Sequence, residues 1–167
     1  MFEKDLLNGK TIVVTGGGTG LGKSMSRRFG ELGANIVISG RRKEKLEDTA
    51  DEFSKLGINV LTCPGDVRKL EDVELMTSQA LDKFGAIDCL LNNAAGNFIS
   101  PTEMLSPNAF KVVIDIVLMG TWNCTSTIGK EMIKNKKGNV LSTVSYTHLR
   151  AHETDSYRVC RLLLEKK

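Results

Sequence analysis

Residues 15–22, TGGGTGLG, carry glycines at a spacing that suits phosphate binding. They follow the apolar run TIVVT and precede a stretch with helical periodicity. Glycines at a strand-to-helix turn let the backbone approach a pyrophosphate, and the helix N-terminus supplies unpaired N–H donors and positive dipole potential. The segment therefore predicts a dinucleotide site, with a flexible loop that binds no ligand as the alternative. The residues expected to take part are Gly16, Gly17, Gly18, Thr19, Gly20, Leu21 and Gly22.

The second apolar run ends in the sequence ISGRRKEK, which predicts the kind of dinucleotide. A carboxylate at this place would accept hydrogen bonds from a free ribose 2′-hydroxyl, whereas a guanidinium pairs with a 2′-phosphate. Ser39 and Gly40 are not acidic, and Arg41 and Arg42 follow at once. NADP is therefore favoured over NAD. The alternative is a solvated helix start, but cations in a first helical turn oppose the macrodipole unless an anion lies nearby.

Two further polar segments follow later apolar runs. The first is GDV, at Gly65 to Val67, and the second is NNAAG, at Asn92 to Gly96. Taken alone, Asp66 could be a helix cap, and Asn92 and Asn93 could be turn formers. Their occurrence in this order after the glycine turn favours a functional role.

The elements that must position these residues alternate regularly. Short apolar, β-branched runs alternate with stretches of helical period that end on glycine or a polar turn. The runs are apolar on both faces, as strands covered by helices on both sides must be. The sequence therefore predicts an α/β fold, a Rossmann-type doubly wound parallel sheet truncated after its fifth strand, in one domain over residues 1–143. The expected strands span residues 11–15, 35–39, 59–63, 87–92 and 139–143.

Apolar stripes predict which helix faces are buried. One stripe runs through Leu46, Ala50, Phe53 and Leu56. Ser106 followed by Pro107 predicts the N-cap and first turn of a long helix that reaches Lys134. The stripe expected along that long helix consists of Phe110, Ile114, Val117, Leu118 and Thr121.

The spacing TGxxxGxG, followed by GDV and NNAAG, resembles the short-chain dehydrogenase/reductase family. The resemblance covers nearly all of residues 1–143. It implies that Asp66, with Val67, contacts the adenine of the cofactor. It also implies that Asn93, Ala94 and Gly96 support the cofactor at the end of the fourth strand.

The segment NNAAGNFISPTEMLSPNAF…DIVLMGT resembles more narrowly the 2,4-dienoyl-CoA reductases of mitochondrial and bacterial type. Most short-chain enzymes place a catalytic asparagine where this sequence has Val117, and dienoyl-CoA reductases share that departure. The resemblance implies that Asn97 takes over, donating to the thioester carbonyl, and that Phe98 and Ser106 contact the acyl-CoA substrate. From the residues alone, Phe98 could be a core residue and Ser106 a helix cap.

This narrower resemblance implies NADPH-dependent reduction of 2,4-dienoyl-CoA thioesters in unsaturated fatty acid β-oxidation, by a homotetramer. Another short-chain oxidoreductase, acting on a 3-oxoacyl thioester or a sugar, is the alternative within the family. A nucleotide-binding module without turnover is the alternative from another class.

Residues 144–167 hold both histidines and both tyrosines of the sequence. By analogy with dienoyl-CoA reductases, Tyr146 lies within one residue of their catalytic tyrosine. However, arginine stands four residues after each tyrosine, where short-chain enzymes commonly have lysine, so we expect the printed chain to be inactive. The segment resembles translated read-through of a sequencing adapter, which predicts a non-native tail. The alternative is a genuine C-terminal segment in which His148 or His152 is a ligand or base.

Composition excludes several other classes of function. The net charge of +3 is small and forms no basic patch, so no nucleic-acid partner is expected. The N-terminal residues lack the pattern of a targeting segment, and no apolar run approaches membrane-spanning length, so we expect a cytoplasmic protein without a membrane partner. The four cysteines lie far apart, which predicts reduced packing residues and no metal site.

Overall fold

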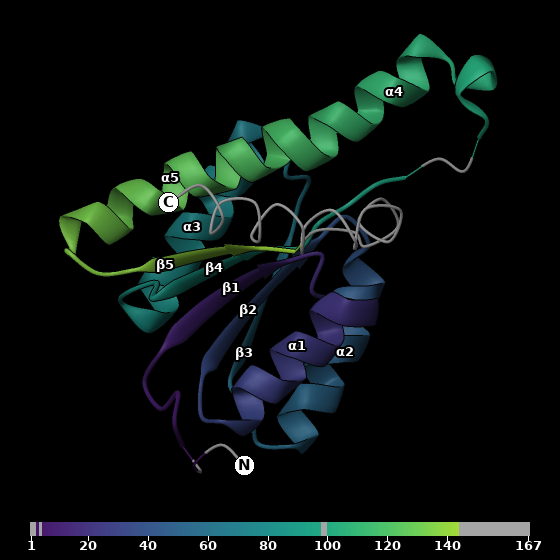
Figure 1. The fold of residues 1–167 in the computed structure, drawn as a ribbon. Coiled ribbons are helices and arrows are strands. Elements are labelled where there is room, and N and C mark those ends of the chain that lie inside the picture. The colour runs from purple at the N-terminus through teal and green to yellow at the C-terminus, as the bar shows by residue number, and fades with distance from the viewer. Residues whose placement is uncertain (1–2, 4, 98–99, 144–167) are drawn as a thin grey trace, which may run out of the picture.

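The computed structural model describes residues 3, 5–97 and 100–143. Within them, five parallel strands form one sheet with the order β3-β2-β1-β4-β5 (Figure 1). The strands are β1 Thr11–Thr15, β2 Asn35–Gly40, β3 Val60–Pro64, β4 Cys89–Asn92 and β5 Asn139–Ser142. The predicted α/β doubly wound sheet is confirmed, and each predicted strand agrees with an observed one to within two residues at either end.

Helices cover both faces of the sheet (Figure 1). On one face lie α1 (Gly20–Glu31) and α2 (Lys43–Lys55), and on the other lie α3 (Leu70–Phe84) and α5 (Gly120–Lys134). The chain moves outward from β1 through β2 to β3, then returns through α3 to place β4 on the opposite side of β1. Because the strand order reverses there, the carboxyl ends of β1 and β4 border a crevice of the kind in which doubly wound proteins bind ligands.

Successive side chains along each strand point to opposite faces of the sheet, so the core forms two layers. Val13 and Val37 face Cys124 and Ile128 of α5, together with apolar residues of α3. Their sequence neighbours face the opposite way: the buried residues of that second layer are Ile12, Val14, Ala34, Ile36, Ile38, Leu46, Phe53, Ile58 and Leu91. The sheet is thus buried on both faces, which explains why its central strands lack polar alternation.

The long helix predicted from Ser106 is present but is not uniform. It comprises α4 (Pro107–Ile114), a π-helical turn η2 (Asp115–Met119) and α5. The Ser106 hydroxyl accepts the Ala109 N–H at 3.2 Å and so caps the helix as predicted. A short 3₁₀ turn, η1 (Thr102–Met104), precedes it.

The apolar stripe predicted for the long helix is wrong in phase. Phe110, Val117 and Leu118 are exposed, whereas the buried positions are Ile116, Gly120, Cys124, Ile128 and Met132. The π-helical turn accounts for part of the difference, because its wider turn offsets the residues before it from those after it. In α2, Leu46 and Phe53 are buried as predicted, but Leu56 is exposed at the helix end and Thr49 is buried.

By length and composition, the continuous helix Pro107–Lys134 could cross a membrane, contrary to the expectation that no segment could. Its buried residues Cys124, Ile128 and Met132 pack in the core against the sheet. Only 22% of its apolar window is buried, so core packing accounts for part of its apolar composition, and the rest is exposed on the surface of the helix.

Candidate nucleotide site

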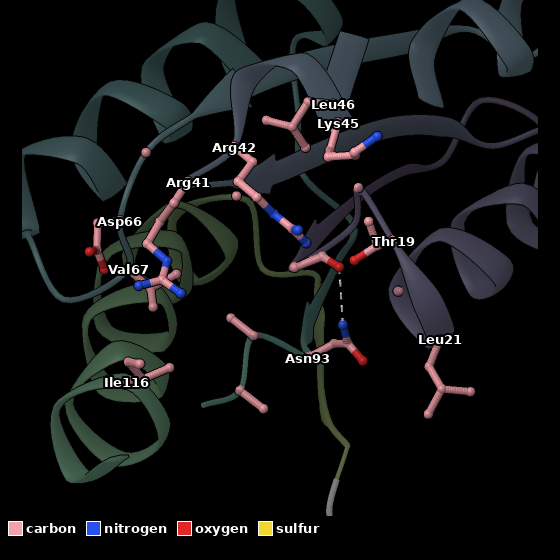
Figure 2. A pocket seen from close by; sticks show the side chains of 17 residues that line it. Thr19, Leu21, Arg41, Arg42, Lys45, Leu46, Asp66, Val67, Asn93 and Ile116 are labelled. Atoms are coloured by element: carbon pink, nitrogen blue, oxygen red, sulfur yellow. Dashed lines mark hydrogen bonds between the residues drawn. The ribbon is translucent and has the colours of Figure 1, made fainter. Parts of the chain in front are cut away.

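A cavity of about 490 Å³ opens at the carboxyl edge of the sheet (Figure 2). Its size falls within the range usual for small-ligand sites, about 300–1,000 Å³. The segments that follow β1, β2, β3 and β4 all contribute to it, so it occupies the crevice expected from the strand order. The lining residues are Gly16, Gly18, Thr19, Leu21, Gly22, Gly40, Arg41, Arg42, Lys45, Leu46, Gly65, Asp66, Val67, Asn93, Ala94, Ala95 and Ile116.

The glycine turn after β1 requires glycine at several positions, of which Gly16 and Gly22 bear most directly on the cavity. Gly16 has a φ of +67°, a left-handed conformation that side chains disfavour. A Cβ on Gly22 would lie only 2.6 Å from the Asn93 Nδ2 atom and closer still to the Gly16 carbonyl oxygen. The turn therefore brings α1 against the end of β4 with no room for a side chain between them.

The N-terminus of α1 lies at the cavity, and among the described residues no acidic side chain of its first turn neutralises it. Thr19 occupies the N-cap position, but its side chain makes no capping hydrogen bond, and the first turn contains no acidic residue. Unpaired N–H groups and the helix dipole favour a negative group at such an end. This arrangement suits a phosphate.

Hydrogen bonds to one hydroxyl group join the carboxyl ends of β1 and β4. Thr15 Oγ1 accepts the N–H of Asn93 at 3.0 Å and that of Ala94 at 2.9 Å. The Asn93 side chain donates to the Thr15 carbonyl at 3.1 Å. Asn93 therefore fixes the backbone at the floor of the cavity. This structural role alone explains why an asparagine stands there, even if its side chain contacts no ligand.

Cations form the wall beyond β2. Arg41, Arg42 and Lys45 all line the cavity. Within the described part of the chain, neither arginine forms an ion pair, whereas Lys45 pairs with Asp48 at 3.1 Å. Arg42 extends toward Thr19, and Arg41 extends toward Asp66 and Val67 (Figure 2). Two available guanidiniums and an uncapped helix N-terminus fit a ligand that carries several phosphates.

Within the described part of the chain, Asp66 is the only carboxylate that lines the cavity, and the neighbouring Arg68 binds it. The Arg68 guanidinium donates to both Asp66 carboxyl oxygens, and the Arg68 N–H donates to Oδ1 at 3.1 Å. Side-chain hydrogen bonds from Arg68 hold the pKa of Asp66 below its ordinary value. The alternative that Asp66 caps α3 is wrong, because Lys69 is the N-cap residue of that helix.

Most of the residues predicted for the cofactor line the cavity. The three that do not are Gly17, Gly20 and Gly96. A Cβ on Gly17 would lie 2.6 Å from Ile38 Cγ2, so that glycine is explained by packing against β2. Gly96 is similarly close to Ile116, at 2.6 Å from its Cδ1 atom.

The residues predicted for catalysis and substrate lie elsewhere. Asn97 is exposed and is not among the cavity-lining residues, and Ser106 is exposed at the start of α4. Phe98 and Tyr146 lie outside the described residues.

Several lining residues were not predicted. Gly40 and Gly65 directly follow or end their strands as Gly16 does, a recurrence that could have indicated them. Lys45 is the third residue of α2, and the two arginines directly precede that helix, so its place in the first turn could have indicated that it lies near them. Ile116 comes from the long helix, and no local pattern marks its approach to the cavity. The residues missed are Gly40, Lys45, Leu46, Gly65, Ala95 and Ile116.

The core cysteines are packing residues, as predicted. Cys63 and Cys124 are buried in the layer beneath α3 and α5. Burial raises the pKa of the Cys63 thiol to about 11 and that of Cys124 to about 12. Neither thiol is therefore suited to nucleophilic chemistry near neutral pH.

Comparison with known proteins agrees with this geometry. Residues 10–156 match the family model described as short chain dehydrogenase. The Peroxisomal 2,4-dienoyl-CoA reductase of Arabidopsis thaliana is 39% identical over 157 residues, which cover 87% of this chain and 53% of the relative. The Probable 2,4-dienoyl-CoA reductase decr-1.2 of Caenorhabditis elegans is 46% identical over 148 residues, covering 86% and 47%.

A crystal structure of a short chain dehydrogenase from Bacillus anthracis superposes with a TM-score of 0.80 at 46% identity, covering 83% of this chain and 56% of that one. The chain spans about half the length of the curated relatives it matches.

Proposed function

The chain belongs to the short-chain dehydrogenase family, and we propose that the complete enzyme to which it contributes reduces 2,4-dienoyl-CoA thioesters with NADPH. The observation that carries this proposal is the 46% identity over 148 residues to a relative named as a probable 2,4-dienoyl-CoA reductase. The two departures noted in the sequence, Val117 in the long helix and Asn97 after the NNAAG segment, support the same activity.

Short-chain dehydrogenases use a nicotinamide dinucleotide, which supplies a hydride when it is bound. In this chain, the N–H groups at the start of α1 would hold its pyrophosphate, because that helix end has neither a side-chain cap nor an acidic residue. Arg41 and Arg42 would hold a 2′-phosphate, because they line the cavity without an ion-pair partner among the described residues. NADPH is therefore the proposed cofactor.

Asp66 would accept a hydrogen bond from the adenine amino group. Arg68 supports this role in two ways, by keeping the carboxylate ionised and by fixing its direction through hydrogen bonds to both oxygens. Val67, the next residue, lines the same part of the cavity and would contact the adenine ring.

Asn97 would act on the substrate. Its side-chain amide can donate a hydrogen bond to the thioester carbonyl, where negative charge develops when hydride reaches the far end of the conjugated system. Phe98 and Ser106 would contact the acyl-CoA, and Tyr146 would take part in proton transfer. These roles rest on the resemblance to dienoyl-CoA reductases.

The proposal extends to the assembly and the pathway. Phe110, Leu118 and Trp122 expose apolar surface along the long helix, which supports the association of copies into a homotetramer. The reaction would belong to the β-oxidation of unsaturated fatty acids. A cytoplasmic location remains a prediction, since one of the similar relatives is named as peroxisomal.

Turnover by the complete enzyme tests the proposal. We expect oxidation of NADPH to depend on a 2,4-dienoyl-CoA and to be slower by orders of magnitude with a 3-oxoacyl-CoA. Preferential turnover of the 3-oxoacyl thioester would identify a different short-chain reductase. Binding of NADPH without turnover of either thioester would identify a nucleotide-binding module.

A further inference from the structure

Lys45 lines the cavity although the sequence patterns did not indicate it. It lies in the first turn of α2, and its backbone carbonyl is 3.4 Å from the point where a Cβ on Gly18 would be. Four residues later, the Thr49 hydroxyl donates to the Gly18 carbonyl at 2.9 Å. The first turns of α2 are thus fixed against the glycine turn, and the Lys45 side chain starts from that contact.

The three cations of the wall do not point the same way (Figure 2). Arg41 extends toward Asp66 and Val67, whereas Arg42 extends toward Thr19. Lys45 lies on the Arg42 side of the wall, nearer the glycine turn than Arg41 does. A phosphate held between α2 and the glycine turn would therefore meet Arg42 and Lys45 on the side of the glycine turn, and Arg41, whose charge also acts on Asp66, on the other side.

The ion pair between Lys45 and Asp48 is weak. Its Nζ atom lies 3.1 Å from Asp48 Oδ2, and both side chains are more than half exposed, at 52% and 66%. Exposed pairs of this kind contribute little to stability, and a doubly charged phosphate attracts an ammonium group more strongly than a single carboxylate does. In addition, a cation in the first turn of a helix opposes the helix dipole unless an anion binds nearby.

We propose that Lys45 joins Arg41 and Arg42 in binding the 2′-phosphate of NADP(H), and that Asp48 competes with that phosphate for Lys45 in the free protein. The inference rests on the proposed use of NADPH and assigns two further residues that set cofactor choice. Asp48 would lower the affinity for NADPH and leave that for NADH unchanged, because NADH has no 2′-phosphate to displace it.

The first test is Lys45→Gln in the complete enzyme, with NADPH and NADH titrated separately at about 0.15 M salt, where long-range charge effects are screened. We expect affinity for NADPH to fall about three- to tenfold and affinity for NADH to stay unchanged. Lys43→Gln is the matched control: Lys43 lies on the same helical turn and pairs with Glu47 at 3.6 Å, but it does not line the cavity.

The second test separates exchange of partners from simple repulsion. Asp48→Asn should raise affinity for NADPH about two- to fivefold, and this gain should vanish when Lys45→Gln is also present. A gain that persists in the double variant would show that Asp48 acts by repelling the phosphate directly, and it would overturn the role given to Lys45.

The outcomes distinguish this inference from the proposed function. If Lys45→Gln changes the ratio of the two affinities no more than Lys43→Gln does, the inference fails while reduction of dienoyl-CoA by NADPH stands. If the unaltered enzyme binds NADH as tightly as NADPH, the proposed cofactor fails and the inference fails with it.

Discussion

The hydroxyl of Thr15 accepts the backbone N–H of Asn93 at 3.0 Å, and the Asn93 side chain donates to the Thr15 carbonyl at 3.1 Å. These reciprocal bonds join the carboxyl ends of β1 and β4 across a separation of 78 residues in the chain. The same hydroxyl accepts the N–H of Ala94. One side chain thus fixes the point at which the strand order reverses.

Thr15→Val should therefore be costly despite the similar shape of the two side chains. It leaves two N–H donors without their acceptor, and an unpaired buried donor costs about 1–3 kcal/mol. Because both donors are only partly buried, we expect the free energy of unfolding to fall by about 1–3 kcal/mol in total, measured by denaturant titration. Thr11→Val, at the other end of β1, is the control, since Thr11 bonds Asp88 through its backbone N–H. Equal losses in the two variants would contradict the role of the Thr15 hydroxyl.

Two glycine-to-alanine substitutions should change the free energy of unfolding in opposite directions. Gly22→Ala places a Cβ against Asn93 and the Gly16 carbonyl, and overpacking of this kind costs about 1–3 kcal/mol. Gly129→Ala, in the interior of α5, meets no atom of the described residues within 4 Å and should stabilise the helix by about 0.5–1 kcal/mol. Thermal unfolding of both variants checks the pair, and a stable Gly22→Ala protein would show that α1 can move away from β4.

Arg41→Ala tests the preference for NADPH in the complete enzyme. Loss of a charge-assisted pair with the 2′-phosphate should weaken NADPH binding by about ten- to a hundredfold, corresponding to about 1.5–3 kcal/mol. Binding of NADH should change little, and titration with each cofactor measures both effects. An unchanged affinity for NADPH would assign the phosphate to Arg42 and Lys45 alone.

Asn97→Ala tests the proposed chemistry. Removing one donor to a developing oxyanion lowers the rate by about a hundred- to a thousandfold. Steady-state turnover of a 2,4-dienoyl-CoA should fall by that factor, while NADPH affinity stays nearly constant because Asn97 does not line the nucleotide cavity. Normal turnover in this variant would contradict the role of Asn97 and leave only the wider assignment to the short-chain dehydrogenases.

The pairing of Asp66 with Arg68 predicts a pH dependence. Because hydrogen bonds from Arg68 lower the folded-state pKa of Asp66, the pair stabilises the fold above the ordinary pKa of aspartate, about 3.9, and this contribution is lost as pH falls through the lower folded-state value. In Arg68→Gln, carboxyl NMR titration should show the Asp66 pKa moved up toward its ordinary value. Lys69→Gln, one residue further on, should leave it in place.

The sequence predicted the central sheet well because parallel strands buried on both faces appear as continuous β-branched runs. It also predicted the positions of the glycine turn and the arginines. Each lies between a strand and the helix that follows it, so the order of elements along the chain determines where it lies. It missed Lys45 and Ile116, which reach the cavity only through the packing of α2 and the long helix around the sheet. It also misplaced Val117 and Leu118, because a π-helical turn within a continuous helix leaves no periodic signal of its own.

The π-helical turn Asp115–Met119 has an evolutionary consequence. Such a turn corresponds to one residue inserted into an α-helix, so the residues before it are rotated relative to those after it. Here the α5 half is constrained by its fit to the sheet through Cys124 and Ile128, and Gly120 sits against Val67 with no space for a Cβ. The rotation of the α4 half about the helix axis is not fixed by this fit to the sheet. Insertions, deletions and changes of side chain can therefore accumulate in α4, and alter whatever it contacts, without disturbing the nucleotide cavity.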